Sequence, residues 1–151
     1  MLIIRTVKST PPGFIHPIKS YEGDAGWDVR SIEDKILQPG EHYKFKLGFK
    51  IIGQPGKVYL TQARSSYAIN YGINVIGNVI DNGYRGEVSV ILQNSNAIGK
   101  FEVKRGDKIA QILIQNVDDD NTLIINGNLI ITELSKREEK GYGSTNEKNK
   151  S

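Results

Sequence analysis

The chain has 151 residues and no cysteine, with 38% hydrophobic and 25% charged residues, which suits one domain with its own core and excludes disulfides and thiolate metal sites. Its formal net charge of +3 is too small and scattered to indicate a duplex-binding face. Because no apolar run approaches the roughly 20 residues that cross a bilayer and the N-terminus lacks secretory-signal features, we expect an intracellular, soluble protein, cytoplasmic or nuclear, that binds neither nucleic acid nor membrane.

Alternation with a period of two dominates the chain. Phe45, Leu47, Phe49 and Ile51 alternate with lysines and a glycine, which predicts a single strand with one buried face. The pattern continues at Val58 and Leu60 and recurs at Val88, Val90 and Leu92. Turn signals separate these runs, at Pro39-Gly40, 53–56, Asn82-Gly83, 105–107 and 126–128. Many short strands joined by turns indicate an all-β sandwich or barrel, and a jelly roll would also hide the sheet edges.

One short helical turn and a polar tail complete the expected organisation. Residues 65–70 are the plausible helical segment, with a serine as its N-cap. From Leu134 onward the only large apolar residues are Leu134 and Tyr142. We therefore predict a β domain over 1–133 and a flexible C-terminal arm over 134–151 that becomes ordered only on a partner.

The first two polar stretches lie in the N-terminal half. In "DAGWDVRS", Asp28 is either an ordinary surface carboxylate at a strand start or a ligand aimed at a hydrated divalent cation. In "ARSSYA", Arg64, Ser65 and Ser66 offer a guanidinium fork, hydroxyls and backbone amides, which has the form of an anion site. The alternative is a capping serine beside a structural arginine.

Two further stretches follow. In "GNVIDNGYRGE", Asn82-Gly83 is a strong hairpin signal, so Asp81 either merely starts a turn or, with Tyr84 beside it, serves as a base that takes a proton from water. In "KRGDKIAQILI", Gln111 is an amide within an apolar strand and must find partners. Those partners are either the backbone of a neighbouring strand or a ligand.

Taken in order along the chain, these stretches resemble the motifs of the homotrimeric dUTPase family. The resemblance rests on AGWDVRS, RSSYA, GNVIDNGYRGE, RGDKIAQ and REEKGYGST, which span nearly the whole chain. It implies a jelly-roll β-barrel that assembles as a homotrimer with active sites shared between subunits. It also implies Mg²⁺-dependent hydrolysis of dUTP to dUMP and pyrophosphate, which limits uracil in DNA and supplies dUMP for dTMP synthesis.

The resemblance also assigns roles to residues of this chain. Asp81 would activate the water that attacks the α-phosphorus, Tyr84 would exclude a 2′-hydroxyl, and the backbone around Asn78 would read uracil. Asp28 would contact magnesium through water. The remaining substrate-binding residues would hold the phosphates or close over the base; they are Arg64, Ser65, Ser66, Gln111, Arg137, Tyr142, Gly143 and Ser144.

Departures from the family pattern and rival functions remain. Lys108 stands where the family usually has an arginine, while Glu138 and Lys140 replace frequent glycines of the arm. A dCTP deaminase-related enzyme is the nearest alternative, but Ile91 occupies the position where a deaminase would carry its glutamate. A dUTPase-like regulatory binding protein is the second alternative, since fold alone does not fix function.

Overall fold

The computed structural model describes residues 1–117, so the predicted boundary near residue 134 and the C-terminal arm lie outside the described residues. The one helix in this part is α1 (Ser65–Tyr71). The strands are β1 (Ile4–Thr6), β2 (Trp27–Arg30), β3 (Lys35–Leu37), β4 (His42–Lys46), β5 (Phe49–Ile51), β6 (Lys57–Gln62), β7 (Ile73–Ile76), β8 (Val79–Ile80), β9 (Ser89–Asn94), β10 (Phe101–Val103) and β11 (Lys108–Asn116). No helix within 1–117 is long and apolar enough to span a membrane.

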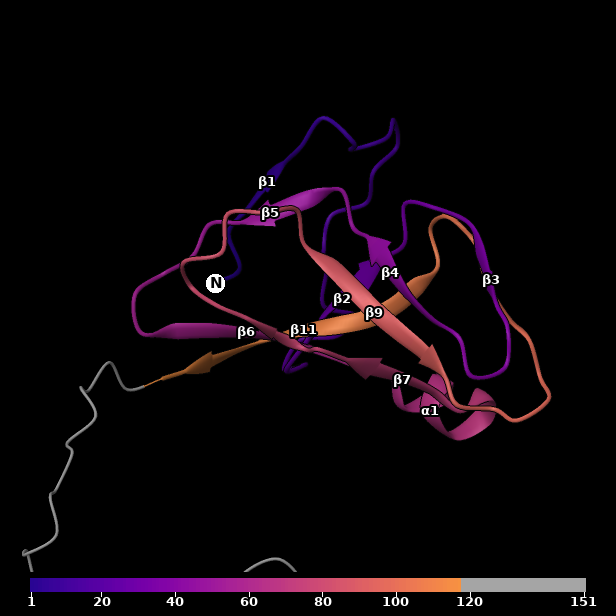
Figure 1. The fold of residues 1–151 in the computed structure, drawn as a ribbon. Helices are drawn as coiled ribbons and strands as arrows, with labels where there is room; N and C mark the ends of the chain where they lie inside the picture. Colours follow the sequence, from indigo (N-terminus) through magenta and orange to yellow (C-terminus); the bar gives the residue numbers. More distant parts are fainter. Residues whose placement is uncertain (118–151) are drawn as a thin grey trace, which may run out of the picture. The chain divides into compact units, whose positions relative to one another are not determined.

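The strands form small antiparallel sheets around one hydrophobic core. A four-stranded sheet has the order β2-β11-β6-β8 and a three-stranded sheet the order β4-β9-β7, while β1 pairs with β5 and β10 with β3. In Figure 1 the long strand β11 runs through the middle of the fold and α1 lies beside β7. Fully buried side chains from both larger sheets meet in the core, among them Val29, Phe45, Tyr59, Val90 and Ile112. The prediction of an all-β fold with one short helical turn is confirmed.

The predicted single strand over Phe45 to Ile51 is instead two strands. The alternating side chains are buried as expected, but Gly48 adopts a φ of 76° and interrupts the strand. On one side of it β4 pairs with β9, and on the other β5 pairs with β1. Because glycine tolerates positive φ without steric strain, the chain changes sheets here while keeping its inward-facing alternation.

The predicted register of β6 is wrong by one residue. The fully buried side chains are Tyr59 and Thr61, whereas Val58 and Leu60 are only half-buried. A shift of one residue exchanges the two faces of a strand. Both faces of β6 carry side chains that can enter a core, and the more hydrophobic pair, Val58 and Leu60, is not the pair that is fully buried.

The Asn82-Gly83 turn forms, but it does not close a hairpin. The Tyr84 amide donates to the Asp81 carbonyl at 3.0 Å, yet β8 pairs with β6 while β9 pairs with β4 and β7. Gly83 lacks the positive φ that the two-residue hairpin turn of an Asn-Gly pair requires. The turn therefore carries the chain from one sheet to the other.

The helix α1 begins and ends differently from the prediction of a serine cap. Its N-cap residue is Arg64, which makes no side-chain capping hydrogen bond, so Ser65 and Ser66 both lie inside the first turn. Gly72 ends the helix with a φ of 67°, and its amide donates to the Ala68 carbonyl at 3.1 Å. The serine hydroxyls are thus not used for capping.

Candidate active site

The first cluster is an open hollow of about 270 Å³, called the phosphate hollow below. It is lined by Asp28, Arg64, Ser65, Ser66 and Gln111. In the β2–β11 ladder Gln111 lies directly opposite Asp28, and in the β6–β11 ladder it lies opposite Gln62. Because α1 follows β6 after a short connection, the arginine and the two serines reach the same place. The structure therefore brings together all the residues of 1–117 that were predicted to bind phosphates or reach the metal.

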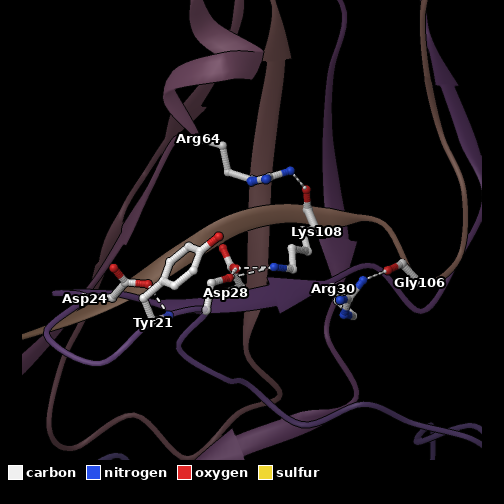
Figure 2. A network of polar contacts seen from close by, with 8 residues as sticks. Tyr21, Asp24, Asp28, Arg30, Arg64, Gly106 and Lys108 are labelled. Carbon is white, nitrogen blue, oxygen red and sulfur yellow. Dashed lines mark hydrogen bonds and ion pairs between the residues drawn. The ribbon is translucent and has the colours of Figure 1, made fainter.

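Asp28 is held by two donors that both contact Oδ2. The Lys108 Nζ lies 2.7 Å from this oxygen, and the Ser20 hydroxyl donates to it at 2.8 Å. Burial by itself raises the pKa of Asp28, but the hydrogen bonds from Lys108 and Ser20 and the nearby positive charges outweigh burial, so the pKa lies below its usual value. Figure 2 shows Lys108 pointing directly at the carboxylate. Asp28 is therefore a fixed, ionised carboxylate.

Arg64 and Gln111 each make one structural hydrogen bond at the edge of the phosphate hollow. The Arg64 Nη1 donates to the Lys108 carbonyl at 3.1 Å, with its guanidinium 5.2 Å from the centre of the Tyr67 ring. The Gln111 Nε2 donates to the Ala63 carbonyl at 3.4 Å, a long bond. Arg64 keeps further donors in its planar fork that a phosphate could use.

The second cluster is a hollow of 180 Å³, called the nucleoside hollow below. Its lining residues are Lys44, Gly77, Val79, Ile80, Asp81, Tyr84, Val88, Ser89 and Ile91. Asp81 and Tyr84 therefore face the same space, as predicted. Gly77 and Val79 line this hollow, but Asn78 between them does not. The Asn78 carbonyl instead accepts a hydrogen bond from the Thr61 amide at 2.8 Å.

The turn that carries Asp81 is exposed, and the loop that contains Gly53 packs closely against it. Tyr84 is 45% exposed, and its hydroxyl donates to the Glu87 carbonyl at 3.1 Å. A Cβ added at Gly53 would lie 2.0 Å from the Asn82 carbonyl oxygen, so only glycine allows this close approach of the two backbones. Gly53 thus supports the turn between Asp81 and Tyr84.

Sequence reasoning missed two lysines of these hollows. The motif comparison marks Lys108 only as a departure from an arginine, and regular alternation does not predict its contact with Asp28. Lys44 lines the nucleoside hollow because it lies opposite Ile91 in the β4–β9 ladder. That register could not be read from the sequence. The arm residues Arg137, Tyr142, Gly143 and Ser144 lie outside the described residues.

Asp28 is the one carboxylate that lines the phosphate hollow, which fits a metal ion held mainly by a substrate. Residues 1–117 contain no group of three or more His, Cys, Asp or Glu side chains that could hold an ion. Magnesium usually keeps several waters and binds one or two carboxylates together with substrate phosphates. Asp28 suits such a water-mediated contact, because its partners within residues 1–117, Lys108 and Ser20, contact only Oδ2.

Comparison with known proteins identifies the family. The dUTPase family model matches residues 14–146. The deoxyuridine 5′-triphosphate nucleotidohydrolase of Zymomonas mobilis is 39% identical over 150 residues, which cover 96% of this chain and 99% of that protein. Among solved structures, the dUTPase of Staphylococcus bacteriophage 80alpha with dUpNHpp has a TM-score of 0.83 at 21% identity and covers 95% of this chain and 97% of that one.

A further solved structure concerns a metal. A mutant dUTPase from phage phi11 of S. aureus, described with a coordinated structural Mg(II) ion, has a TM-score of 0.75 at 20% identity and covers 85% of this chain and 98% of that one. These structural similarities show a shared fold, a β jelly roll. The dUTPase family model spans most of this chain, and a relative of nearly equal length is 39% identical to it, so the chain belongs to the dUTPase family.

Proposed function

We propose that the protein hydrolyses dUTP to dUMP and pyrophosphate. Membership of the dUTPase family supports this activity. The observation that carries the residue assignments is the sorting of side chains between the two hollows. The nucleoside hollow is lined mainly by apolar residues and an aromatic ring, together with Asp81, Lys44 and Ser89. Every side chain that lines the phosphate hollow is polar or charged: an arginine, two serines, an amide and Asp28. A nucleoside suits the first and a polyphosphate suits the second.

Asp81 is the proposed base. Asp81 lines the nucleoside hollow, where its carboxylate would orient a water molecule and take its proton. The water oxygen forms a bond to the α-phosphorus, and the bond from that phosphorus to the α,β-bridging oxygen breaks. Pyrophosphate leaves with the bond electrons, and dUMP remains.

The nucleoside hollow accounts for selectivity in this proposal. Tyr84 lines this hollow, and a ring in contact with C2′ would reject a 2′-hydroxyl by steric clash. Ile91 lines the same hollow and cannot transfer a proton, which argues against deamination of a cytosine base. Backbone groups around Asn78 would read uracil. Within this stretch Gly77 and Val79 line the nucleoside hollow.

The phosphate hollow would hold the triphosphate through Arg64, Ser65, Ser66 and Gln111. Asp28 would contact the hydrated Mg²⁺ ion through water, in keeping with the reluctance of this ion to lose its waters. When bound, Mg²⁺ supplies neutralisation of the negative charge that develops on the phosphate oxygens. Asp28 would contribute a carboxylate in a fixed position. Its contacts with Lys108 and Ser20 hold that carboxylate in place.

Active sites shared within a homotrimer complete the proposal. The two hollows have no lining residue in common, as expected if each meets its complement from another copy of the chain. Arg137, Tyr142, Gly143 and Ser144 of the arm would close over the nucleotide. The mass of the native particle measured by light scattering would show three copies if this proposal is right.

The test compares dUTP, UTP, dCTP and dTTP with and without Mg²⁺. Pyrophosphate should be released preferentially from dUTP in the presence of Mg²⁺, and ammonia from dCTP would overturn the proposal. Asp81→Asn should lose turnover yet retain binding of the nucleotide. Glu102→Gln, which neutralises an exposed carboxylate on β10, is the matched control and should retain full activity.

A further inference from the structure

The strand β11 contains an irregularity beside the phosphate hollow. In its ladder with β2, Lys108 pairs with Arg30 and Ala110 pairs with Val29. Two steps along β11 therefore match a single step along β2, and Ile109 is the extra residue of a β-bulge. Bulges are frequent next to active sites, where they re-aim a side chain.

The bulge decides which face of the sheet Lys108 occupies. In a regular strand, residues three apart such as Lys108 and Gln111 project to opposite faces. Here Ile109 and Ala110 are both fully buried in succession, and regular alternation resumes from Ala110. Lys108 therefore emerges on the same face as Gln111. Without the extra residue, one of these two polar side chains would point into the core.

On that face Lys108 connects three components of the site. Its Nζ lies 2.7 Å from Asp28 Oδ2 and donates to the Ser20 hydroxyl at 2.8 Å, while Ser20 donates to the same carboxylate oxygen. Its carbonyl accepts the Arg64 guanidinium at 3.1 Å. Figure 2 shows both contacts, with Lys108 between the arginine and the carboxylate. The pair is largely buried, with the Lys108 and Asp28 side chains 25% and 17% exposed.

We propose that Lys108 is a positioning residue of the phosphate site and that the bulge at Ile109 exists to deliver it. The ammonium fixes Asp28 through Oδ2 and leaves Oδ1 for a water of the hydrated Mg²⁺–triphosphate. This inference rests on the proposed function. A positioning role differs from direct contact between Lys108 and a phosphate oxygen. A positioning lysine has an effect only while Asp28 is present, whereas a direct ligand has the same effect without Asp28.

A double-mutant cycle separates these two roles. Lys108→Met, Asp28→Asn and the double variant are compared with the unchanged protein in binding of α,β-imido-dUTP with Mg²⁺ by calorimetry, and in kcat and KM for dUTP. Lys108→Met should raise the Kd, the KM and the Mg²⁺ concentration for half-maximal activity roughly fivefold each, a typical coupling between contacting residues, with kcat changed less than about twofold. In the Asp28→Asn background the same substitution should have less than about a twofold effect.

Two further variants control for charge and for folding. Lys104→Met removes the same charge from an exposed position in the preceding turn and should leave every constant unchanged. Lys108→Arg keeps a cation within reach of Asp28 and should restore the constants, a rescue that a purely steric role would not give. Circular dichroism melting of each variant identifies any that fail to fold.

Other outcomes overturn the inference in distinguishable ways. Equal losses from Lys108→Met in both backgrounds would make Lys108 a direct phosphate ligand. Unchanged constants in Lys108→Met would leave the ammonium without a role in the site. If the unchanged protein neither binds α,β-imido-dUTP nor releases pyrophosphate from dUTP, the proposed function itself fails, and the inference fails with it.

Discussion

Replacing Gly53 with alanine should displace the turn that carries Asp81. A Cβ at position 53 would lie 2.0 Å from the Asn82 carbonyl oxygen and 2.9 Å from its carbonyl carbon, whereas real Cβ contacts essentially never fall below 3.0 Å. The backbone of one loop must therefore retreat by about 1 Å, the difference between 3.0 Å and 2.0 Å. Gly53 has no positive φ, so alanine adds only this clash and no torsional strain.

A misplacement of about 1 Å at a catalytic group can reduce turnover on the order of 100-fold, equivalent to about 2.7 kcal/mol of transition-state stabilisation. We expect that reduction in kcat for dUTP, measured by pyrophosphate release, in a Gly53→Ala protein whose circular dichroism melting still shows a folded state. Gly83→Ala is the matched control, because its Cβ in the same turn would meet open space. If Gly53→Ala turns over within about threefold of the unchanged protein, Gly53 does not hold the Asp81 turn in place.

Three other predictions concern stability in urea unfolding. Tyr59→Phe should raise the unfolding free energy by about 1 kcal/mol, because the buried Tyr59 hydroxyl has no partner among residues 1–117; a loss would point to a partner elsewhere. Asn94→Ala should lower it by about 2 kcal/mol or more by removing the bonds from its amide to the Leu37 and Gly99 carbonyls, and an unchanged value would contradict this. Folding lowers the pKa of Asp28, so the ionised carboxylate stabilises the folded protein fully above its unfolded pKa of about 3.9. This stabilisation disappears as pH falls through the folded pKa. The difference in unfolding free energy between the unchanged protein and Asp28→Asn should therefore shrink below about pH 4.

The sequence predicted which side chains would be buried better than it predicted how strands would end or pair. The alternation around Phe45 was read correctly as a buried face, yet nothing local reveals that the chain changes sheets at Gly48. At β6 two faces competed, and only the packing of Tyr59 decided between them. Pairing partners depend on contacts distant in sequence, which periodicity cannot report.

The candidate site was predictable to the extent that its chemistry lies in motifs. Asp81 with Tyr84, and Asp28 with Arg64 and Gln111, meet as two groups in the structure. The contact between Lys108 and Asp28 was not predictable, because it depends on an extra residue in β11 that reverses the alternation. Regular spacing would have placed that lysine on the other face.

The sheet order described above has a consequence for folding kinetics. Within residues 1–117 no strand pairs with its immediate neighbour in sequence, since even the closest pair, β7 and β9, has β8 between its members. No local hairpin can therefore nucleate folding, and long loops must close before ladder bonds compensate for the lost chain entropy. Because pairing between distant segments slows folding, we expect refolding in roughly milliseconds to seconds, as for other β proteins with non-local strand pairing. The same topology that distributes each hollow over distant segments is thus one that we expect to fold slowly.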